Sequence, residues 1–88
     1  MDIATMDRVD IVNSYGDYGA SVRKGSPKEA FCLNPCSDTA LAVAEQHEDR
    51  FNRDGHIATI AVTARAARDR WLAIAARLDE LEQQQEGS

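Results

Sequence analysis

The sequence predicts a mainly all-α protein built on an antiparallel helical hairpin with a long C-terminal helix. Residues 56–85, HIATIAVTARAARDRWLAIAARLDELEQQQ, contain neither proline nor glycine, so no residue there interrupts a helix. Apolar side chains recur in this stretch at alternating spacings of three and four residues, as they do on one helical face. A similar spacing runs through residues 37–53, and short connections place neighbouring helices antiparallel.

The first segment, residues 1–25, is irregular. Val9, Ile11 and Val22 have side chains that favour strands, and SYGDYG at 14–19 is typical of a turn. The pattern is too short to separate a small β-hairpin from a short helix followed by a loop, so both alternatives stay open.

A short helix and turn are predicted at residues 26–36. Ser26 can cap the helix, Pro27 suits the first helical position, and Glu29 stands where a capping box requires it. Pro35 ends the helix, because the residue before a proline avoids helical backbone angles. The helix therefore has about two turns.

The next helix is predicted at residues 37–53, with Ser37 or Asn34 as its cap. Gly55 follows this helix and is free to adopt the left-handed conformation that often ends one. The apolar stripe of the helix has spacings of four, three and four residues and consists of Ala40, Ala44, His47 and Phe51. We expect His47 to lie in the core with a hydrogen-bonding neighbour.

The long helix, residues 56–85, carries a regular apolar seam. At about 1.5 Å per residue it spans roughly 40 Å, and its partner spans roughly 25 Å. The part from Trp71 onwards should therefore project and need a cover. Either the N-terminal third, with Tyr15, Tyr18, Phe31 and Leu33, or a second copy of the chain could supply that cover. We expect a homo-oligomer, with a dimer favoured. The seam consists of Ile57, Ile60, Ala64, Ala67, Trp71, Ile74, Leu78 and Leu81.

Length and charge restrict the classes of function. The chain has 88 residues, which suits a single small domain over 1–88, and its formal net charge is −5. That charge opposes a general electrostatic attraction to nucleic acid or anionic lipid. No apolar run is long enough to cross a bilayer, and the first residues lack the order of a secretory signal. We therefore expect a cytoplasmic protein that does not contact membranes.

One alternative function is a structural zinc site. Cys32, Cys36, His47 and His56 supply four side chains of the types that bind zinc. Zinc sites favour two residues between paired cysteines, however, and here there are three, one of them proline. The two histidines also belong to opposite ends of the predicted hairpin. We therefore expect no metal and no other cofactor.

A second alternative is a small regulator that contacts nucleic acid or a nucleotide. Arginines beside a tryptophan can hold phosphates while nucleobases stack on the ring. A loop of tyrosines, glycines and basic residues can also hold a phosphate. No Walker or dinucleotide motif is present, and Arg65 can pair with Asp69 one turn away. These observations, with the acidic charge, count against nucleic acid as a partner. The residues concerned are Tyr15, Arg23, Lys24, Arg65, Arg68 and Arg70.

The function favoured by the sequence is non-enzymatic binding to a protein. No nucleophile, base and orienting group form a local catalytic signature. The acidic residues Glu45, Glu48 and Asp49 lie off the apolar stripe and offer a face to a basic partner, with Trp71 and Tyr18 as aromatic anchors. In size, charge and helicity the chain resembles the small acidic helical proteins of phages and mobile elements that act by binding one host protein, so we expect an inhibitor or an adaptor. No residue motif carries that resemblance.

Overall fold

The computed structural model describes residues 2–16 and 23–86. Within these residues every regular element is helical, and the predicted all-α hairpin is confirmed. The elements are a 3₁₀ turn η1 (Ile3–Thr5), α1 (Arg8–Tyr15), α2 (Pro27–Leu33), α3 (Ser37–Asp54) and α4 (Ala58–Glu86).

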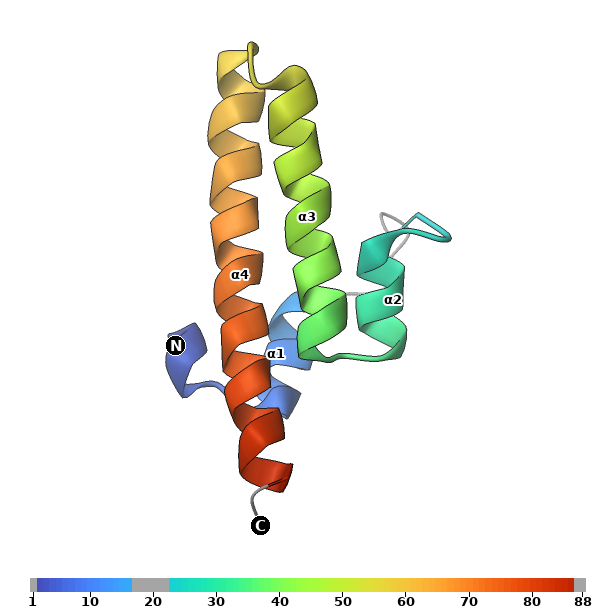
Figure 1. Ribbon diagram of the computed structural model, residues 1–88, viewed down its shortest axis with the longest axis vertical. Coiled ribbons are helices and arrows are strands. Elements are labelled where there is room, and N and C mark those ends of the chain that lie inside the picture. The colour runs from blue at the N-terminus through green and yellow to red at the C-terminus, as the bar shows by residue number, and fades with distance from the viewer. Residues whose placement is uncertain (1, 17–22, 87–88) are drawn as a thin grey trace.

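The hairpin of α3 and α4 forms the long axis of the molecule, which measures 47 × 24 × 21 Å (Figure 1). α2 packs against α3, whereas η1 and α1 pack against α4. The N-terminal elements thus lie beside the half of the hairpin that is remote from its tip, and the tip consists of two helices alone (Figure 1). No helix in residues 2–16 and 23–86 is both long and apolar enough to pass through a membrane.

The N-terminal segment contains a helix over 8–15, so the β-hairpin alternative is wrong for the residues described there. A reciprocal capping box begins this helix: the Asp10 amide donates to Asp7 at 2.8 Å, and the Asp7 amide donates to Asp10 at 3.4 Å. These bonds satisfy amides that a helix start leaves unpaired and override the strand preference of Val9 and Ile11. Of the expected turn at 14–19, residues 14 and 15 belong to α1 instead, and residues 17–19 lie outside the described residues, as does Val22.

α2 begins where the sequence indicates, with Ser26 as its cap, but the predicted capping box is incomplete because the Glu29 carboxylate bonds to Gly25 rather than to the Ser26 amide. The Ser26 hydroxyl accepts from the Glu29 amide at 3.3 Å, and the Glu29 carboxylate accepts from the Gly25 amide at 3.1 Å. Gly25 has a φ of +82°, a conformation that favours glycine.

α3 begins differently from the prediction, because Cys36 rather than Ser37 or Asn34 is the residue before its first turn. The Cys36 amide donates to the Thr39 hydroxyl at 3.1 Å. Ser37 instead bonds across the hairpin, since its amide and hydroxyl both lie 3.2 Å from the Glu82 carboxylate. The positive end of the α3 dipole also stabilises the Glu82 carboxylate at the start of α3.

The hairpin turn also differs in detail. Gly55 has a φ of −67° and does not adopt the left-handed conformation. A side chain at this position would bring its Cβ to 2.3 Å from the Phe51 carbonyl oxygen, so close backbone approach explains the glycine. α3 continues to Asp54 and α4 begins at Ala58, each within two residues of the predicted bounds.

The core is one cluster that contains residues of the hairpin and of the N-terminal third. Phe31 packs edge-on against Trp71, with ring centroids 4.8 Å apart, and Tyr15 lies on the same ring at 6.3 Å. The Arg77 guanidinium donates to the Met6 carbonyl at 2.7 Å. The buried cluster consists of Met6, Ile11, Phe31, Ala40, Val43, Ala44, Trp71, Ile74, Ala75 and Leu78.

The projecting part of α4 is therefore covered within the chain. Trp71, Ile74 and Leu78 are buried, and Ser37 of α3 reaches as far along α4 as Glu82. Glu82 can reach back because helical side chains point toward the N-terminal end of their helix. These three apolar residues therefore need no second copy of the chain to cover them. The dimer stays a prediction. Leu33, expected in the cover, is 70% exposed.

Candidate functional site

The predicted acidic residues of α3 adjoin two different surfaces. Glu45, Glu48 and Asp49 are exposed, and none forms an ion pair with another described residue. Leu41, Glu45 and Glu48 are spaced by four and three residues and therefore lie on one face. Asp49 follows Glu45 by four residues and so lies beside it, and it also lines a hollow together with Arg50 and other basic side chains.

A groove between α3 and α4 adjoins the side that carries Leu41. We call it the Leu41–Leu72 groove, after two leucines that are each 44% exposed. Its volume is about 320 Å³, and carboxylates of Asp38 and Asp79 lie among its lining residues. Apolar side chains between carboxylates can hold a chain segment that carries both apolar and basic side chains. The full lining is Ser37, Asp38, Leu41, Leu72, Ala75, Ala76 and Asp79.

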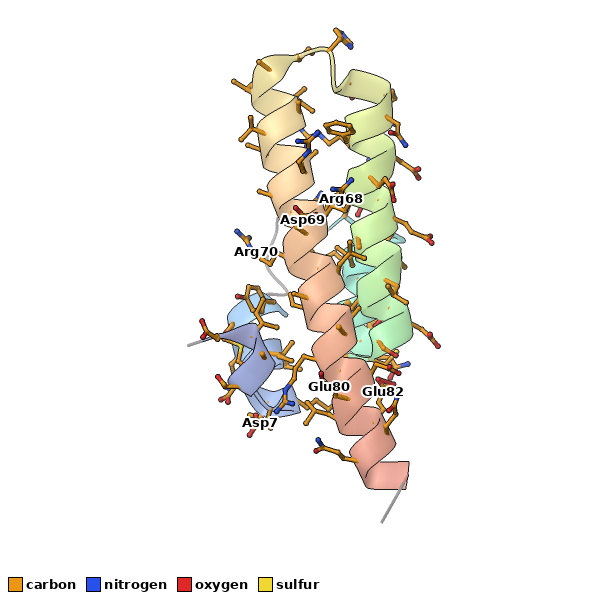
Figure 2. All side chains as sticks on the ribbon, turned by 60° about the vertical axis from the view of Figure 1, so that its left-hand side comes forward. Asp7, Arg68, Asp69, Arg70, Glu80 and Glu82 are labelled. Atoms are coloured by element: carbon orange, nitrogen blue, oxygen red, sulfur yellow. The ribbon has the colours of Figure 1, made fainter. Side chains whose placement is uncertain are left out.

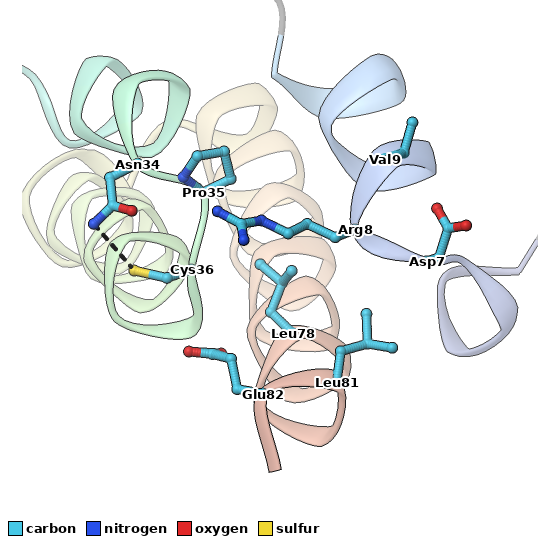
Figure 3. Close-up of a pocket in the computed structure, with 9 residues that line it drawn as sticks. All are labelled: Asp7, Arg8, Val9, Asn34, Pro35, Cys36, Leu78, Leu81 and Glu82. Atoms are coloured by element: carbon cyan, nitrogen blue, oxygen red, sulfur yellow. Dashed lines mark hydrogen bonds between the residues drawn. The ribbon is translucent and has the colours of Figure 1, made fainter. Parts of the chain in front are cut away.

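A second hollow, of about 390 Å³, lies where α1, the α2–α3 link and the end of α4 meet (Figure 3). Figure 3 shows Arg8 extended across it from α1 toward Pro35. The Cys36 thiol accepts from the Asn34 amide at 3.9 Å, and the lining residues include no histidine that could activate it. The lining is Asp7, Arg8, Val9, Asn34, Pro35, Cys36, Leu78, Leu81 and Glu82.

A basic cluster lies on the side of α3 that faces α2. Two adjoining hollows of about 390 and 260 Å³ share Arg23, Gln46 and His47 as lining residues. Lys28 lines the larger hollow and places its Nζ 5.4 Å from the centroid of the Trp71 ring. We define the basic cluster as Arg23, Lys28, His47, Arg50 and Arg53.

His47 is half-buried within this cluster rather than fully enclosed in the core. Burial lowers the pKa of its imidazole below the ordinary value of 6.5, and the charges of Arg50, Lys28 and Arg70 lower it further. Both causes oppose the charged form, because burial removes water and the neighbours carry the same sign.

The lowered pKa of His47 predicts a loss of stability in mild acid. The unfolded chain takes up the proton near pH 6.5, whereas the native protein takes it up only at lower pH, so stability falls as pH decreases below about 6.5. Urea unfolding between about pH 7.5 and 5.5 should show this slope in the wild type and a smaller slope in His47→Gln. His56→Gln, at the exposed tip, is the control. Equal slopes in wild type and His47→Gln would contradict the prediction.

The predicted aromatic anchors are not available on the described surface. Trp71 is 4% exposed and lies beneath Phe31, Tyr15 and Lys28. Tyr18 lies outside the described residues. Tyr15, named for the nucleotide alternative, packs on Trp71 instead of facing a loop ligand.

The arginines of α4 do not form one basic face. Arg65 stacks over Phe51 at 5.1 Å, and Arg68 pairs with Asp69 at 3.1 Å, so Asp69 does not pair with Arg65 as expected. Figure 2 shows Arg70 on the opposite side of α4 from Arg68. Of the loop bases, Arg23 joins the basic cluster, whereas Lys24 is exposed and lines none of the hollows described above.

The four candidate zinc ligands are spread over the molecule. The Cys32 thiol donates to the Gly16 carbonyl at 3.5 Å, Cys36 precedes α3 as its cap, His47 lies in the basic cluster, and His56 is exposed at the hairpin tip. Across residues 2–16 and 23–86, no three histidine, cysteine or acidic side chains are grouped closely enough to hold a metal ion.

Sequence reasoning missed Leu41 and Leu72, and it missed Lys28, Arg50 and Arg53. A signal for the leucines existed, since each directly follows a seam residue, Ala40 or Trp71, and thus lies off the seam. No such signal joins Lys28 to α3, because only the packing of α2 brings them together.

No protein-family model, curated protein or solved structure matches this chain. The surfaces of the described residues are therefore the basis for a functional proposal. Two of them combine exposure with a distinct chemistry: the Leu41–Leu72 groove with its carboxylates, and the basic cluster on the α2 side of α3.

Proposed function

We propose that the chain is a non-catalytic protein-interaction module that holds a basic, amphipathic segment of a partner protein in the Leu41–Leu72 groove. The observation that carries this proposal is the exposure of two leucines in one groove whose lining includes two carboxylates. The apolar side chains of the partner would cover the leucines, and its lysines or arginines would meet Asp38 and Asp79.

The charges beside the groove support a basic partner. Glu45 and Glu48 continue from Leu41 along the same side of α3, are exposed and form no ion pair with a described residue. Surface carboxylates in such a row raise the rate of association with a basic partner and disfavour acidic ones. The burial of the leucines would supply most of the affinity, since buried apolar anchors dominate interface energies.

An interaction of this kind suits an inhibitor or an adaptor. A segment held along α3 and α4 is masked from other partners, and no chemical step is needed for that effect. The hairpin is closely packed at this point, because Ala40 and Ala44 of α3 and Ala75, which lines the groove, are buried.

The probe that tests the proposal is an amphipathic helical peptide with leucines on one face and arginines on the other. We expect saturable binding by the wild type in fluorescence anisotropy and a loss of at least about tenfold in affinity for Leu72→Asp, which puts a charge on the apolar contact. Glu45→Lys with Glu48→Lys should slow association and weaken binding, most strongly at low salt.

Val62→Asp is the matched control, because Val62 is 70% exposed on the same helix but lines a different surface near the tip. It should bind the peptide like the wild type. A glutamate version of the peptide should not bind. Equal affinity of the wild type and Leu72→Asp would remove the groove from consideration.

A further inference from the structure

The basic cluster is unusual in a chain whose formal net charge is −5. Three arginines and one lysine of the cluster line two adjoining hollows, and Asp49 is the carboxylate among the lining residues. Like charges brought together repel, and an anion bound among them would relieve that repulsion.

The bases come from separate parts of the chain that the fold brings together. Arg23 precedes α2, Lys28 belongs to the first turn of α2, and Arg50 and Arg53 lie one turn apart on α3. The packing of α2 against α3 therefore builds the cluster. A run of consecutive bases, by contrast, would form an exposed charged patch without a hollow.

Most of these basic side chains are not neutralised by an ion pair with a described residue. Arg23, Lys28 and Arg50 form no ion pair with a described residue, and Arg53 pairs with its neighbour Asp54 at 3.2 Å while its side chain stays 73% exposed. Ser26 lines the larger hollow and Gln46 lines both, and each can donate a hydrogen bond from its side chain.

We infer that the basic cluster is a binding site for the phosphate groups of a small phosphorylated molecule. Arg23, Gln46 and His47 line both hollows, so a ligand with two linked phosphates can contact Lys28 in one and Arg50 in the other. Arginine and lysine form strong charge-assisted hydrogen bonds with phosphate oxygens. This site is independent of the proposed function of the Leu41–Leu72 groove.

Inorganic pyrophosphate is the first probe, titrated into the full chain at low ionic strength. Trp71 is the single tryptophan and lies beneath Lys28, so its emission and its indole resonance report on the site directly. We expect a saturable change with pyrophosphate, a weaker one with inorganic phosphate, and weakening of both by salt.

Charge changes of both signs test the assignment. Lys28→Gln and Arg50→Gln should each weaken pyrophosphate binding about tenfold, whereas Asp49→Asn should strengthen it by about threefold. Lys28 also contacts Trp71, so its replacement could change the tryptophan signal by itself. Binding by Lys28→Gln is therefore measured from the amide resonances of α3. Lys28→Arg should bind like the wild type. Arg8→Gln removes one positive charge from a different hollow and should bind like the wild type.

Two further probes distinguish other sources of the same chemistry. Vesicles with anionic phospholipid present phosphates on a surface, and a short single-stranded oligonucleotide presents them along a strand. Binding of either one without binding of pyrophosphate would overturn the inference. Absence of any pyrophosphate response, or an equal loss in Arg8→Gln and Arg50→Gln, would overturn it as well.

Discussion

Replacing Phe31 with alanine is expected to lower the free energy of unfolding by about 3–5 kcal/mol. Phe31 is fully buried and contributes one of the two rings that pack on Trp71. The substitution removes apolar contacts and leaves a cavity that α2, a helix of 7 residues, cannot close by itself. Small domains have only about 5–15 kcal/mol of stability in total, so the loss is a large fraction of it.

Urea unfolding followed by Trp71 emission and by far-ultraviolet circular dichroism measures this effect. Leu33→Ala is the matched control, because it removes an apolar side chain from the same helix at a position that is 70% exposed. We expect a change within about 0.5 kcal/mol for the control. Similar losses for both variants would mean that α2 does not dock through Phe31.

The helices of the hairpin could be predicted because their signals are local. An unbroken stretch from Ile57 to Leu81 with regular apolar spacing leaves few alternatives to a helix, and Ser26 with Pro27 marks a helix start without reference to the rest of the fold. The 8-residue helix α1 has no comparable periodicity, and its start depends on two aspartates, Asp7 and Asp10, that cap each other.

The sites were harder to predict than the helices, because they depend on how elements pack. Trp71 is of a residue type that often anchors protein interfaces, yet the N-terminal third covers it. Lys28 and Arg50 are far apart in sequence and come to line adjoining hollows only through the docking of α2 on α3. Asp49 belongs to the acidic stretch in sequence but lies among bases in space.

Helix geometry explains how α3 serves two surfaces of opposite charge. Leu41, Glu45 and Glu48 follow one side, whereas Gln46, Arg50 and Arg53 follow another, since residues three and four apart are neighbours on a helix. The proposed peptide groove and the proposed phosphate site therefore share a helix without sharing a face, and variants at one should leave ligand binding at the other intact.

Ile11→Asp is expected to release α1 from the hairpin and to promote self-association. Ile11 is fully buried in the same cluster as Ile74 and Leu78. Burying an unpaired carboxylate costs several kcal/mol. If α1 undocks, the carboxylate reaches water and that cost is avoided, but the apolar side chains that α1 covers become exposed. We expect a loss of about 3 kcal/mol in the free energy of unfolding and a larger mass in solution than for the wild type.

Light scattering measures the mass, and the wild-type value also tests the predicted dimer. Val9→Asp is the control for Ile11→Asp, because it introduces the same charge into the same helix at a position that is 65% exposed. It should leave both mass and stability close to those of the wild type. If Ile11→Asp behaved like Val9→Asp, α1 would not cover the hairpin, and Ile74 and Leu78 would need another copy of the chain to bury them.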